Sequence, residues 1–412
     1  MTHPIAEKIR CAGGNLYLVG GAVRDQLMGR EPKDKDYCVT GLTAEQFSRL
    51  FPEAILTGKD FPVFRIDGIA DEEYALARTE RKTGRGYKGF QVDSSPEVTI
   101  EEDLKRRDLT INSVAIEVAT GEIVDPFGGV EDIRRGIIRA TSEAFGEDPL
   151  RVYRAARFAA RFGFSVEPGT LEMMRGMKEE LIHLTPERVG LEVIKALETE
   201  NPSIFFRVLA EADVLDVHFP ELDALIGVPQ PPEHHPEGDA FEHSMQVLEA
   251  MARMTKDPVL RWVAVVHDLG KGVTPKELLP KHHGHEKAGA PLVGELGRRI
   301  KLPKRFTRAA KVGAAEHMRA FRIGEMRPGK AVRFLEQVRK SHLGIEGLAL
   351  LVKADHRGRN NPDAEVPEAE ELIRMAEVIF SVTGRDIDAN PGPGFAEKLM
   401  QARVRKLMAY RA

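Results

Sequence analysis

The sequence has few cysteines, no long apolar run and no export signal. Of its 412 residues only Cys11 and Cys38 are cysteine, so at most one disulfide can form, which fits a reducing cytoplasm. The longest strongly apolar stretches, Leu16 to Val23 and Trp262 to Val266, fall short of the roughly 18 residues that a membrane helix needs. The start, MTHPIAEKIR, lacks the features of a secretory leader. We therefore expect a cytoplasmic protein without a membrane span.

An excess of either charge is also missing. The chain has 60 Lys plus Arg and 64 Asp plus Glu, a formal charge of −4, which excludes a protein coated in positive charge. Nucleic-acid binding would therefore depend on where the basic residues cluster. With 42% hydrophobic and 30% charged residues the composition is that of a globular protein. At roughly 150 residues per domain, two to four compact units are expected.

The pattern of the chain changes near residue 130. Before it, short apolar runs alternate with turn signals, as in NLYLVGGAVRDQLMG, which predicts a strand at Leu16 to Val19, a glycine turn and a helix. After it, apolar residues recur at spacings of three and four, which predicts helices almost to the end. The Pro- and His-rich stretch from Gly227 to Asp239 interrupts the helices and is interpreted as a linker. We expect an α+β fold, mostly α, with an N-terminal mixed sheet.

A glycine turn precedes a pair of carboxylates. Gly20 and Gly21 separate the strand from the helix, and such a turn lets backbone N–H groups approach a phosphate. Asp34 and Asp36 follow on a predicted strand, where residues two apart face one side and can share Mg²⁺. The alternative is an exposed turn, but the glycine turn upstream and Arg24 beside it favour a catalytic site. A third carboxylate at Glu73, on a further predicted strand, remains open.

A stripe of arginines follows a carboxylate later in the chain. Asp148, Arg151, Arg154, Arg157 and Arg161 are spaced three or four apart on a helix that Pro149 can start. A salt-bridged surface helix is the structural alternative. Chemically, a carboxylate offers acceptors and a guanidinium offers donors, so together they can imitate the edge of a complementary base.

Histidines are concentrated in the second half, where ten of the 13 lie between His234 and His356. The segment VLRWVAVVHDLGKG places His267 and Asp268 after an apolar helix, which Gly270 is expected to end, and the two can share one metal. Lys271 is a candidate for holding a phosphate. Four further histidines are candidates for a second metal or a phosphate contact, although a surface position is the better expectation for each: His282, His283, His285 and His317.

Several motifs in order resemble class II nucleotidyltransferases, and specifically the bacterial tRNA CCA-adding enzymes. They are LVGGAVRD, KDKD, ARTERK…GF, EEDLKRRDLTIN, DPFGG and EDPLRVYRAARFAARF. The resemblance implies that Gly21 and Arg24 hold a nucleoside triphosphate and that Asp34 and Asp36 bind Mg²⁺ and are catalytic. It also implies that Glu147, Asp148 and Arg151 select CTP or ATP without a template. Further positions on the bound nucleotide match Arg107, Arg154 and Arg157.

The second half resembles HD-domain phosphohydrolases. In that family four residues, matched here by His243, His267, Asp268 and Asp355, ligate a divalent metal that activates water, and His267 and Asp268 are the catalytic pair. The combination with the N-terminal motifs resembles the multifunctional subgroup of CCA-adding enzymes. That resemblance implies hydrolysis of 2′,3′-cyclic phosphates, 2′-nucleotides and phosphate esters, with Ni²⁺ or another divalent metal as cofactor.

These expectations assign a nucleotidyltransferase head to 1–139, a helical neck and body to 140–226, an HD domain to 227–360 and a helical tail to 361–412. The expected partners are tRNA, CTP and ATP, with no membrane, and the expected state is a monomer or weak homo-oligomer. Three rival functions remain open. They are a bacterial poly(A) polymerase, an HD phosphohydrolase whose N-terminal half senses nucleotides, and a non-catalytic RNA-binding scaffold.

Overall fold

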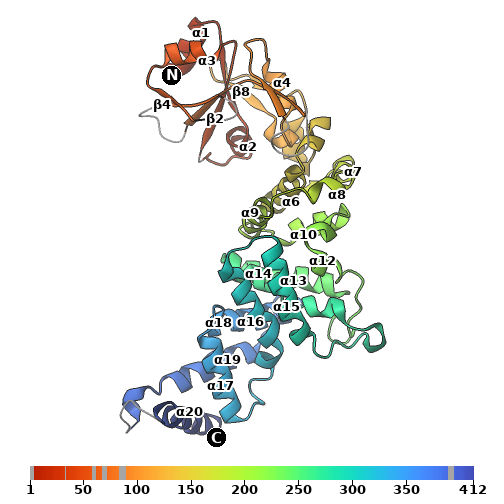
Figure 1. Ribbon diagram of the computed structural model, residues 1–412, viewed down its shortest axis with the longest axis vertical. Helices are drawn as coiled ribbons and strands as arrows, with labels where there is room; N and C mark the ends of the chain where they lie inside the picture. The colour runs from red at the N-terminus through yellow and green to blue at the C-terminus, as the bar shows by residue number, and fades with distance from the viewer. Residues whose placement is uncertain (1–3, 33, 58–61, 67–71, 83–89, 388–393) are drawn as a thin grey trace. The chain divides into compact units, whose positions relative to one another are not determined.

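The computed structural model describes residues 4–32, 34–57, 62–66, 72–82, 90–387 and 394–412. The chain divides into two compact units, Met1–Leu184 and Thr185–Ala412. The strands formed by the described residues all lie in the first unit, and the second is helical (Figure 1). The predicted class, α+β and mostly α, is therefore confirmed.

The first unit contains a seven-stranded mixed sheet with the order β3-β4-β5-β2-β1-β8-β9. Strand β2 pairs antiparallel with β1 and parallel with β5, so it lies at the centre and changes the direction of pairing. The strands are β1 (Asn15–Val19), β2 (Lys35–Thr40), β3 (Ala54–Leu56), β4 (Val63–Ile66), β5 (Glu72–Leu76), β8 (Ala115–Glu117) and β9 (Ile123–Val124). The strands expected around Leu16, Asp36 and Glu73 are confirmed.

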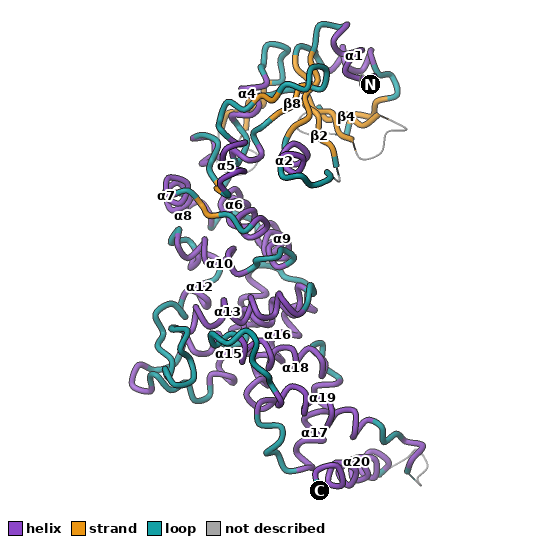
Figure 2. The backbone as a smooth tube through the Cα atoms, turned by 180° about the vertical axis from the view of Figure 1, so that it is seen from behind, coloured by secondary structure: helices purple, strands orange, loops and turns teal. Residues whose placement is uncertain are grey.

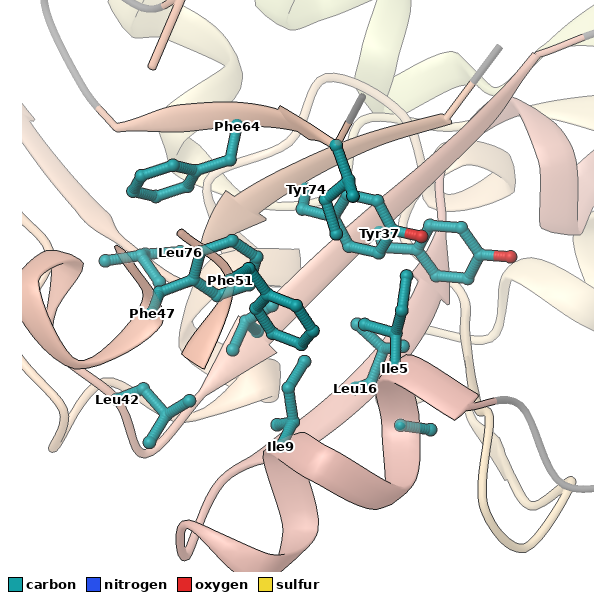
Figure 3. Close-up of a cluster of buried hydrophobic side chains, with 13 residues drawn as sticks. Ile5, Ile9, Leu16, Tyr37, Leu42, Phe47, Phe51, Phe64, Tyr74 and Leu76 are labelled. Carbon is teal, nitrogen blue, oxygen red and sulfur yellow. The ribbon is translucent and has the colours of Figure 1, made fainter. Parts of the chain in front are cut away.

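One face of the sheet buries an aromatic core. Helices α1 (Pro4–Cys11) and α3 (Ala44–Leu50) cover this face, and Phe47 contacts the rings of Phe51 and Phe64 at centroid distances of 4.9 and 4.5 Å (Figure 3). Tyr37 of β2 stacks on Tyr74 of β5 at 5.0 Å, which fixes the parallel pair from this side.

The opposite face of the sheet packs against α4 (Ile100–Lys105), through Ile100 and Leu104. Because successive strand residues alternate between faces, Cys38 belongs to this second core while its neighbours Tyr37 and Val39 belong to the aromatic one. Asp36, two residues before Cys38, is therefore on the α4 side. The sheet thus directs one carboxylate toward the helix that precedes the RRD motif, which is Arg106, Arg107 and Asp108.

The first unit continues through short helices and a long one. Helix α6 (Leu150–Phe162) begins after Pro149, as predicted, and ends at Gly163 in the left-handed conformation with φ 70°. The remaining α-helices and strands of this unit are α2 (Gly21–Leu27), β6 (Thr79–Lys82), β7 (Phe90–Asp93), α5 (Gly129–Arg135), β10 (Ile137–Ile138), β11 (Ser165–Val166), α7 (Pro168–Gly176) and α8 (Lys178–Leu181).

The second unit is a stack of helices (Figure 2). Buried Arg261 joins three segments of it, because its guanidinium donates to the carbonyl oxygens of Leu197, Thr199, Ala252 and Thr255. The helices are α9 (Pro186–Leu197), α10 (Ser203–Glu211), α11 (Leu215–His218), α12 (Pro220–Asp223), α13 (Ala240–Met254), α14 (Pro258–Val266), α15 (His285–Arg299), α16 (Lys304–Phe321), α17 (Pro328–Arg339), α18 (Gly344–Arg357), α19 (Pro367–Phe380) and α20 (Phe395–Arg411).

Two sequence-based interpretations in this unit were wrong. Helix α14 ends at Val266, and Gly270 lies in the following 3-10 turn, Leu269–Val273. Gly270 is required by close packing instead, since a Cβ there would lie 2.0 Å from the carbonyl oxygen of His285. The stretch from Gly227 to Asp239 is not a free linker, because its side chains contact the histidine cluster described below. Among the helices in the described ranges, none has both the length and the hydrophobicity that crossing a bilayer requires.

Candidate active sites

The glycine turn and the aspartates of the first unit are neighbours in the sheet. Val19, the last residue of β1, pairs with Asp36 of β2, so the Gly20 turn begins one residue from the carboxylate. Gly20 has φ 69°, a conformation that favours glycine, and helix α2 starts directly after it. Asp34 lies in a bend just before β2 rather than on the strand, and both aspartates are exposed. The sequence-predicted carboxylate pair is therefore accessible to a ligand.

A third carboxylate stands beside the pair. In the parallel ladder Asp36 is opposite Glu73 of β5, so the two side chains point to the same face. Desolvation raises the pKa of Asp36, and the negative charges of Glu73 and Asp34 raise it further, while Arg107 opposes the shift. Glu73 also forms an ion pair with Arg65. Excess negative charge of this kind is what a divalent cation would neutralise.

Arg107 is held behind the glycine turn by a buried carboxylate. Its guanidinium donates to Asp103 at 2.9 Å, and a Cβ at Gly20 would lie 3.1 Å from its Nη1. Burial alone would raise the pKa of Asp103, but Arg107 and Arg106 hold it at about 2. The predicted nucleotide residue Arg107 is thus fixed next to the turn.

Arg24 is buried beneath the same turn. It donates to Asp25 at 2.8 and 2.9 Å and to the side-chain oxygen of Asn112 at 2.5 Å. Its guanidinium carbon lies 5.2 Å from the ring centroid of Phe158 and 4.9 Å from that of Phe162, both on α6. Arg24 therefore connects the turn to the arginine-rich helix.

The arginines of α6 form salt bridges, as the structural alternative describes, but only Arg161 of the three that follow Arg151 is exposed. Arg157 is buried, with its guanidinium carbon 4.3 Å from the Phe158 ring centroid. Arg154 donates to the buried carboxylate of Asp108 at 2.6 and 2.8 Å. Arg161 lies 3.4 Å from Asp25. The stripe thus packs the helix against Asp25, which follows the glycine turn, and against Asp108, the last residue of the RRD motif.

The expected base-selecting residues lie at the N-terminus of α6. Asp148 accepts a hydrogen bond from the backbone N–H of Leu150 at 3.0 Å, which places its carboxylate over the first turn. Arg151 donates to the carbonyl oxygens of Ala144 and Arg106, each at 2.7 Å. Glu147, Asp148 and Arg151 are all half-buried. Arg151 is therefore positioned by backbone of the RRD segment.

In the second unit, buried histidines and aspartates from separate helices converge. His243 comes from α13, His267 and Asp268 follow α14, and Asp355 comes from α18, and all four are at most 3% exposed. Nε2 of His243 lies 3.3 Å from Asp355 and 3.6 Å from Asp268, and Nε2 of His267 lies 3.3 Å from Asp268. The four residues that match the HD-domain phosphohydrolases are thus brought together.

The hydrogen bonds of the rings leave lone pairs directed at the cluster. Nδ1 of His267 lies 2.9 Å from the carbonyl oxygen of Ala264, and since a carbonyl can only accept, Nδ1 carries the proton. Nε2 is then an acceptor in the neutral ring, and burial lowers the pKa of His267. Among the described residues, Nε2 of His243 and of His267 are buried without a hydrogen-bond partner. Unsatisfied acceptors beside carboxylates fit a bound cation.

His285 and His317 extend the cluster, and the expectation that each is a surface histidine was wrong. Both are buried, with Nε2 atoms 3.1 and 3.4 Å from Oδ1 of Asp268 and 3.2 Å from each other. In both rings Nδ1 donates to backbone carbonyls. His283 is exposed, and His282 is held by Thr274 and the carbonyl oxygen of Pro229. Only the helical spacing of His317 signals its burial in the sequence.

Four further residues of this site escaped the sequence analysis. The buried carboxylate of Glu237 accepts from Nδ1 of His243 at 2.7 Å and of His235 at 2.8 Å. Burial would raise the pKa of Glu237, but these two hydrogen bonds lower it to about 2. Gln230 accepts from Lys271, which also lies 2.6 Å from Asp268, and Arg359 donates to Asp355 at 2.8 Å. Lys271 thus places a positive charge beside the carboxylate of Asp268, and Arg359 places one beside that of Asp355.

Cys38 is not a nucleophile in this arrangement. It is buried in the core on the α4 side, and burial raises its pKa well above the ordinary value. The thiolate is therefore unavailable at neutral pH. Cys38 therefore serves packing in the core on the α4 side.

Three family models match successive parts of the chain. The "Poly A polymerase head domain" matches residues 16–139, the "Probable RNA and SrmB- binding site of polymerase A" matches 163–226, and the "HD domain" matches 240–366. The first match contains the glycine turn and the carboxylates. The third contains the histidine cluster.

Whole-chain relatives agree with these matches. The chain is 45% identical to multifunctional CCA proteins of Nitrosococcus oceani, over 95% of this chain and 97% of the relative, and of Stenotrophomonas maltophilia, over 96% and 100%. A solved Thermotoga maritima CCA-adding enzyme complexed with a tRNA shares the fold, with a TM-score of 0.63, 21% identity and coverage of 98% of this chain and 89% of that one. The chain belongs to the multifunctional CCA protein family.

Proposed function

We propose that this protein adds C, C and A in turn to the 3′ end of tRNA, from CTP and ATP and without a template, releasing pyrophosphate. The observation that carries the proposal is the meeting of Asp36, Glu73 and the Gly20 turn at one place in the sheet. A carboxylate cluster and a phosphate-accommodating turn are the two parts that nucleotidyl transfer requires. Membership of the multifunctional CCA protein family supports the same assignment.

In this proposal Asp34 and Asp36 hold Mg²⁺, and Glu73 is the candidate third carboxylate. When bound, the ion supplies positive charge for the attacking 3′-hydroxyl oxygen and the leaving pyrophosphate. Gly21 and Arg24 hold the triphosphate, and Arg107 adds positive charge from behind the turn. The contribution of these residues is alignment, which brings the hydroxyl into line with the α-phosphate. No covalent intermediate on the protein is needed.

Base selection is assigned to the N-terminus of α6. Asp148 offers carboxylate acceptors and Arg151 offers guanidinium donors, with Glu147 beside them, so the pair can imitate a complementary base edge. Arg154 and Arg157 are proposed to contact the bound nucleotide from the same helix. Their ordered packing against Asp108 and Phe158 supports a fixed template surface.

The second candidate function is hydrolysis of phosphoesters in the histidine cluster. His243, His267, Asp268 and Asp355 are proposed to hold a divalent metal, with Ni²⁺ as the candidate for phosphatase activity, and His267 and Asp268 are the catalytic pair. When bound, the metal supplies an activated water for attack on phosphorus. Lys271 is assigned to the substrate phosphate, and His285 and His317 to a second ion or to the phosphate. The substrates proposed are 2′,3′-cyclic phosphates, 2′-nucleotides and phosphate monoesters.

One assay separates the candidates. The protein is incubated with tRNA that ends before CCA, Mg²⁺ and labelled CTP or ATP, and the product is sequenced. Addition of C, C and A supports the proposal. Incorporation of a run of A selects the poly(A) polymerase, and hydrolysis of phosphoesters without incorporation selects the phosphohydrolase with a nucleotide-sensing half. Binding without either reaction selects the RNA-binding scaffold.

A further inference from the structure

Positive charge gathers where α15 ends and α16 begins. From Arg298 to Val312 the chain has seven Lys or Arg and no Asp or Glu, in a protein with a net charge of −4. One of the seven, Arg299, is ion-paired with Glu221 at 2.6 Å. The other six are exposed, and we call them the basic surface: Arg298, Lys301, Lys304, Arg305, Arg308 and Lys311. Within the described ranges of the chain none of these six forms an ion pair.

Folding stability does not explain this arrangement. Lys304 and Arg305 occupy the first turn of α16, where the helix dipole disfavours positive charge, and no acidic residue accompanies them there. Lys304 and Arg308 are four residues apart, and Arg308 and Lys311 three apart, so like charges repel along one side of the helix. Each of these features lowers stability, which points to a role for the charge outside the fold.

The core does not use this side of α16 either. At 100° per residue, Lys304, Arg308 and Lys311 lie within about 60° of one another. The buried residues Phe306 and Ala310 lie on the other side of the helix, against the rest of the unit. The exposed face is therefore available to a partner, and its residues can be changed without opening the core.

The chemistry of the surface fits phosphate groups. The large apolar side chains exposed in the described part of the chain do not include any between Arg298 and Val312. A membrane-binding or peptide-binding face would need such apolar anchors, whereas contacts to a nucleic-acid backbone need only cationic donors. The spacing of the side chains along one helix suits a polymer with repeated charge.

We propose that the basic surface binds the sugar–phosphate backbone of RNA and so holds tRNA on the second unit. This inference rests on the proposed function, because that function supplies the RNA. The same helix also carries His317 into the histidine cluster, so RNA held at its start would be anchored to the element that helps to build the hydrolytic site. The contacts are to phosphates and are independent of base sequence.

The test compares two triple variants of the full-length protein. In the first, Lys304→Gln, Arg308→Gln and Lys311→Gln remove three charges from the basic surface. In the control, Lys256→Gln, Arg322→Gln and Arg374→Gln remove three exposed charges of the same unit that are paired with Glu200, Glu325 and Glu371. The affinity for tRNA lacking CCA is measured from 50 to 200 mM salt, and CTP incorporation and hydrolysis of a small phosphoester are measured alongside.

For the first variant we expect about ten-fold weaker tRNA binding near 0.1 M salt and a salt slope smaller by about 2, as the loss of three phosphate contacts predicts. The control variant should bind as wild type, and both should hydrolyse the small phosphoester normally. Equal affinity and slope in the two variants would overturn the inference. Binding to poly-glutamate is measured as a second polyanion. If only that binding weakened in the first variant, the inference would be overturned and the surface would be assigned to an acidic protein. Failure of the wild-type protein to incorporate CTP, by contrast, would refute the proposed function, whereas the inference is tested by the tRNA affinities and salt slopes.

Discussion

The two acidic sites differ in how much of their geometry exists before a ligand arrives. In the first unit Asp34 and Asp36 are exposed at the end of a sheet, and their mutual repulsion is partly uncompensated. In the second unit the four histidines His243, His267, His285 and His317 are buried. Each ring is oriented by a hydrogen bond from Nδ1, the nitrogen that faces away from the cluster, as in the pair of His243 and Glu237. An open carboxylate site can admit a long RNA end together with a nucleotide. A buried cluster instead favours a small reacting group and tight metal binding.

The largest expected effect separates the two sites completely. Asp36→Ala should lower nucleotide addition at least about 100-fold and should leave phosphoester hydrolysis intact. The loss should be this large because removing a metal ligand lowers activity more than removing a residue that only hydrogen-bonds a ligand. Asp268→Ala should do the reverse. Both activities are measured on each purified variant, with circular dichroism to check folding. Loss of both activities in either folded variant would show that the sites are not independent.

The close packing of the buried cluster can be broken at Gly270. A Cβ there would meet the carbonyl oxygen of His285 at 2.0 Å, so Gly270→Ala should destabilise the second unit by roughly 1–3 kcal/mol and displace the N-terminus of α15. Thermal unfolding and hydrolysis are the measurements, and CTP incorporation should change less. Gly329→Ala is the matched control, because a Cβ there contacts nothing within 4 Å. Equal effects of the two changes would contradict the packing argument.

The hydrogen bonds around the buried site are tested through Glu237. Glu237→Ala removes the acceptor that orients His243 and should weaken metal binding about 10–100-fold, whereas Glu237→Gln keeps an oxygen acceptor and should restore most of it. Metal affinity is measured by competition with a chelator, and the absorption spectrum of the Co²⁺ form reports the geometry. If Gln and Ala behave alike, Glu237 does not act through His243.

The smallest effect concerns the open site without its ion. Because its pKa is raised in the folded state, ionised Asp36 costs stability at neutral pH, and the cost disappears as the pH falls below about 4, the pKa of an unfolded aspartate. Asp36→Asn should therefore raise the melting temperature of the metal-free protein slightly at pH 7 and not at pH 3.5. A lower melting temperature of the variant at pH 7 would show that the carboxylate is stabilised by partners instead. Added Mg²⁺ should reduce the difference.

The sequence predicted the local parts of both sites better than their surroundings. Short apolar segments and turn signals predicted strands around Leu16 and Asp36, and the resemblance to HD-domain phosphohydrolases matched His243 and Asp355, which the structure brings together. The roles that the family resemblance implies for the site residues stay predictions, because the position of a residue does not show that it contacts a nucleotide or a metal. Local patterns succeed here because they depend on period and residue type alone.

The features that the sequence left open, missed or misassigned all depend on tertiary contacts. Glu73 stands beside Asp36 only because β5 pairs with β2 in a particular parallel register, which alternation cannot specify. Glu237 belongs to a loop whose Pro- and His-rich composition resembles a linker, yet its carboxylate reaches a helix that starts after it. Gly270 was interpreted as a helix end because glycine often has that role, whereas here the reason is the approach of another backbone.

The pairing of β2 with β5 limits how far the head can be shortened. A fragment ending after β2 would keep Asp34 and Asp36 but would leave an unpaired edge where Glu73 and Tyr74 belong. The necessary segment extends further, because Arg107 follows α4 and is held by Asp103 of that helix. The polymerising module therefore has to run without interruption from about Asn15 at least through α6, whose Phe158 and Phe162 pack on Arg24, and dissection of this enzyme by truncation should begin downstream of that helix.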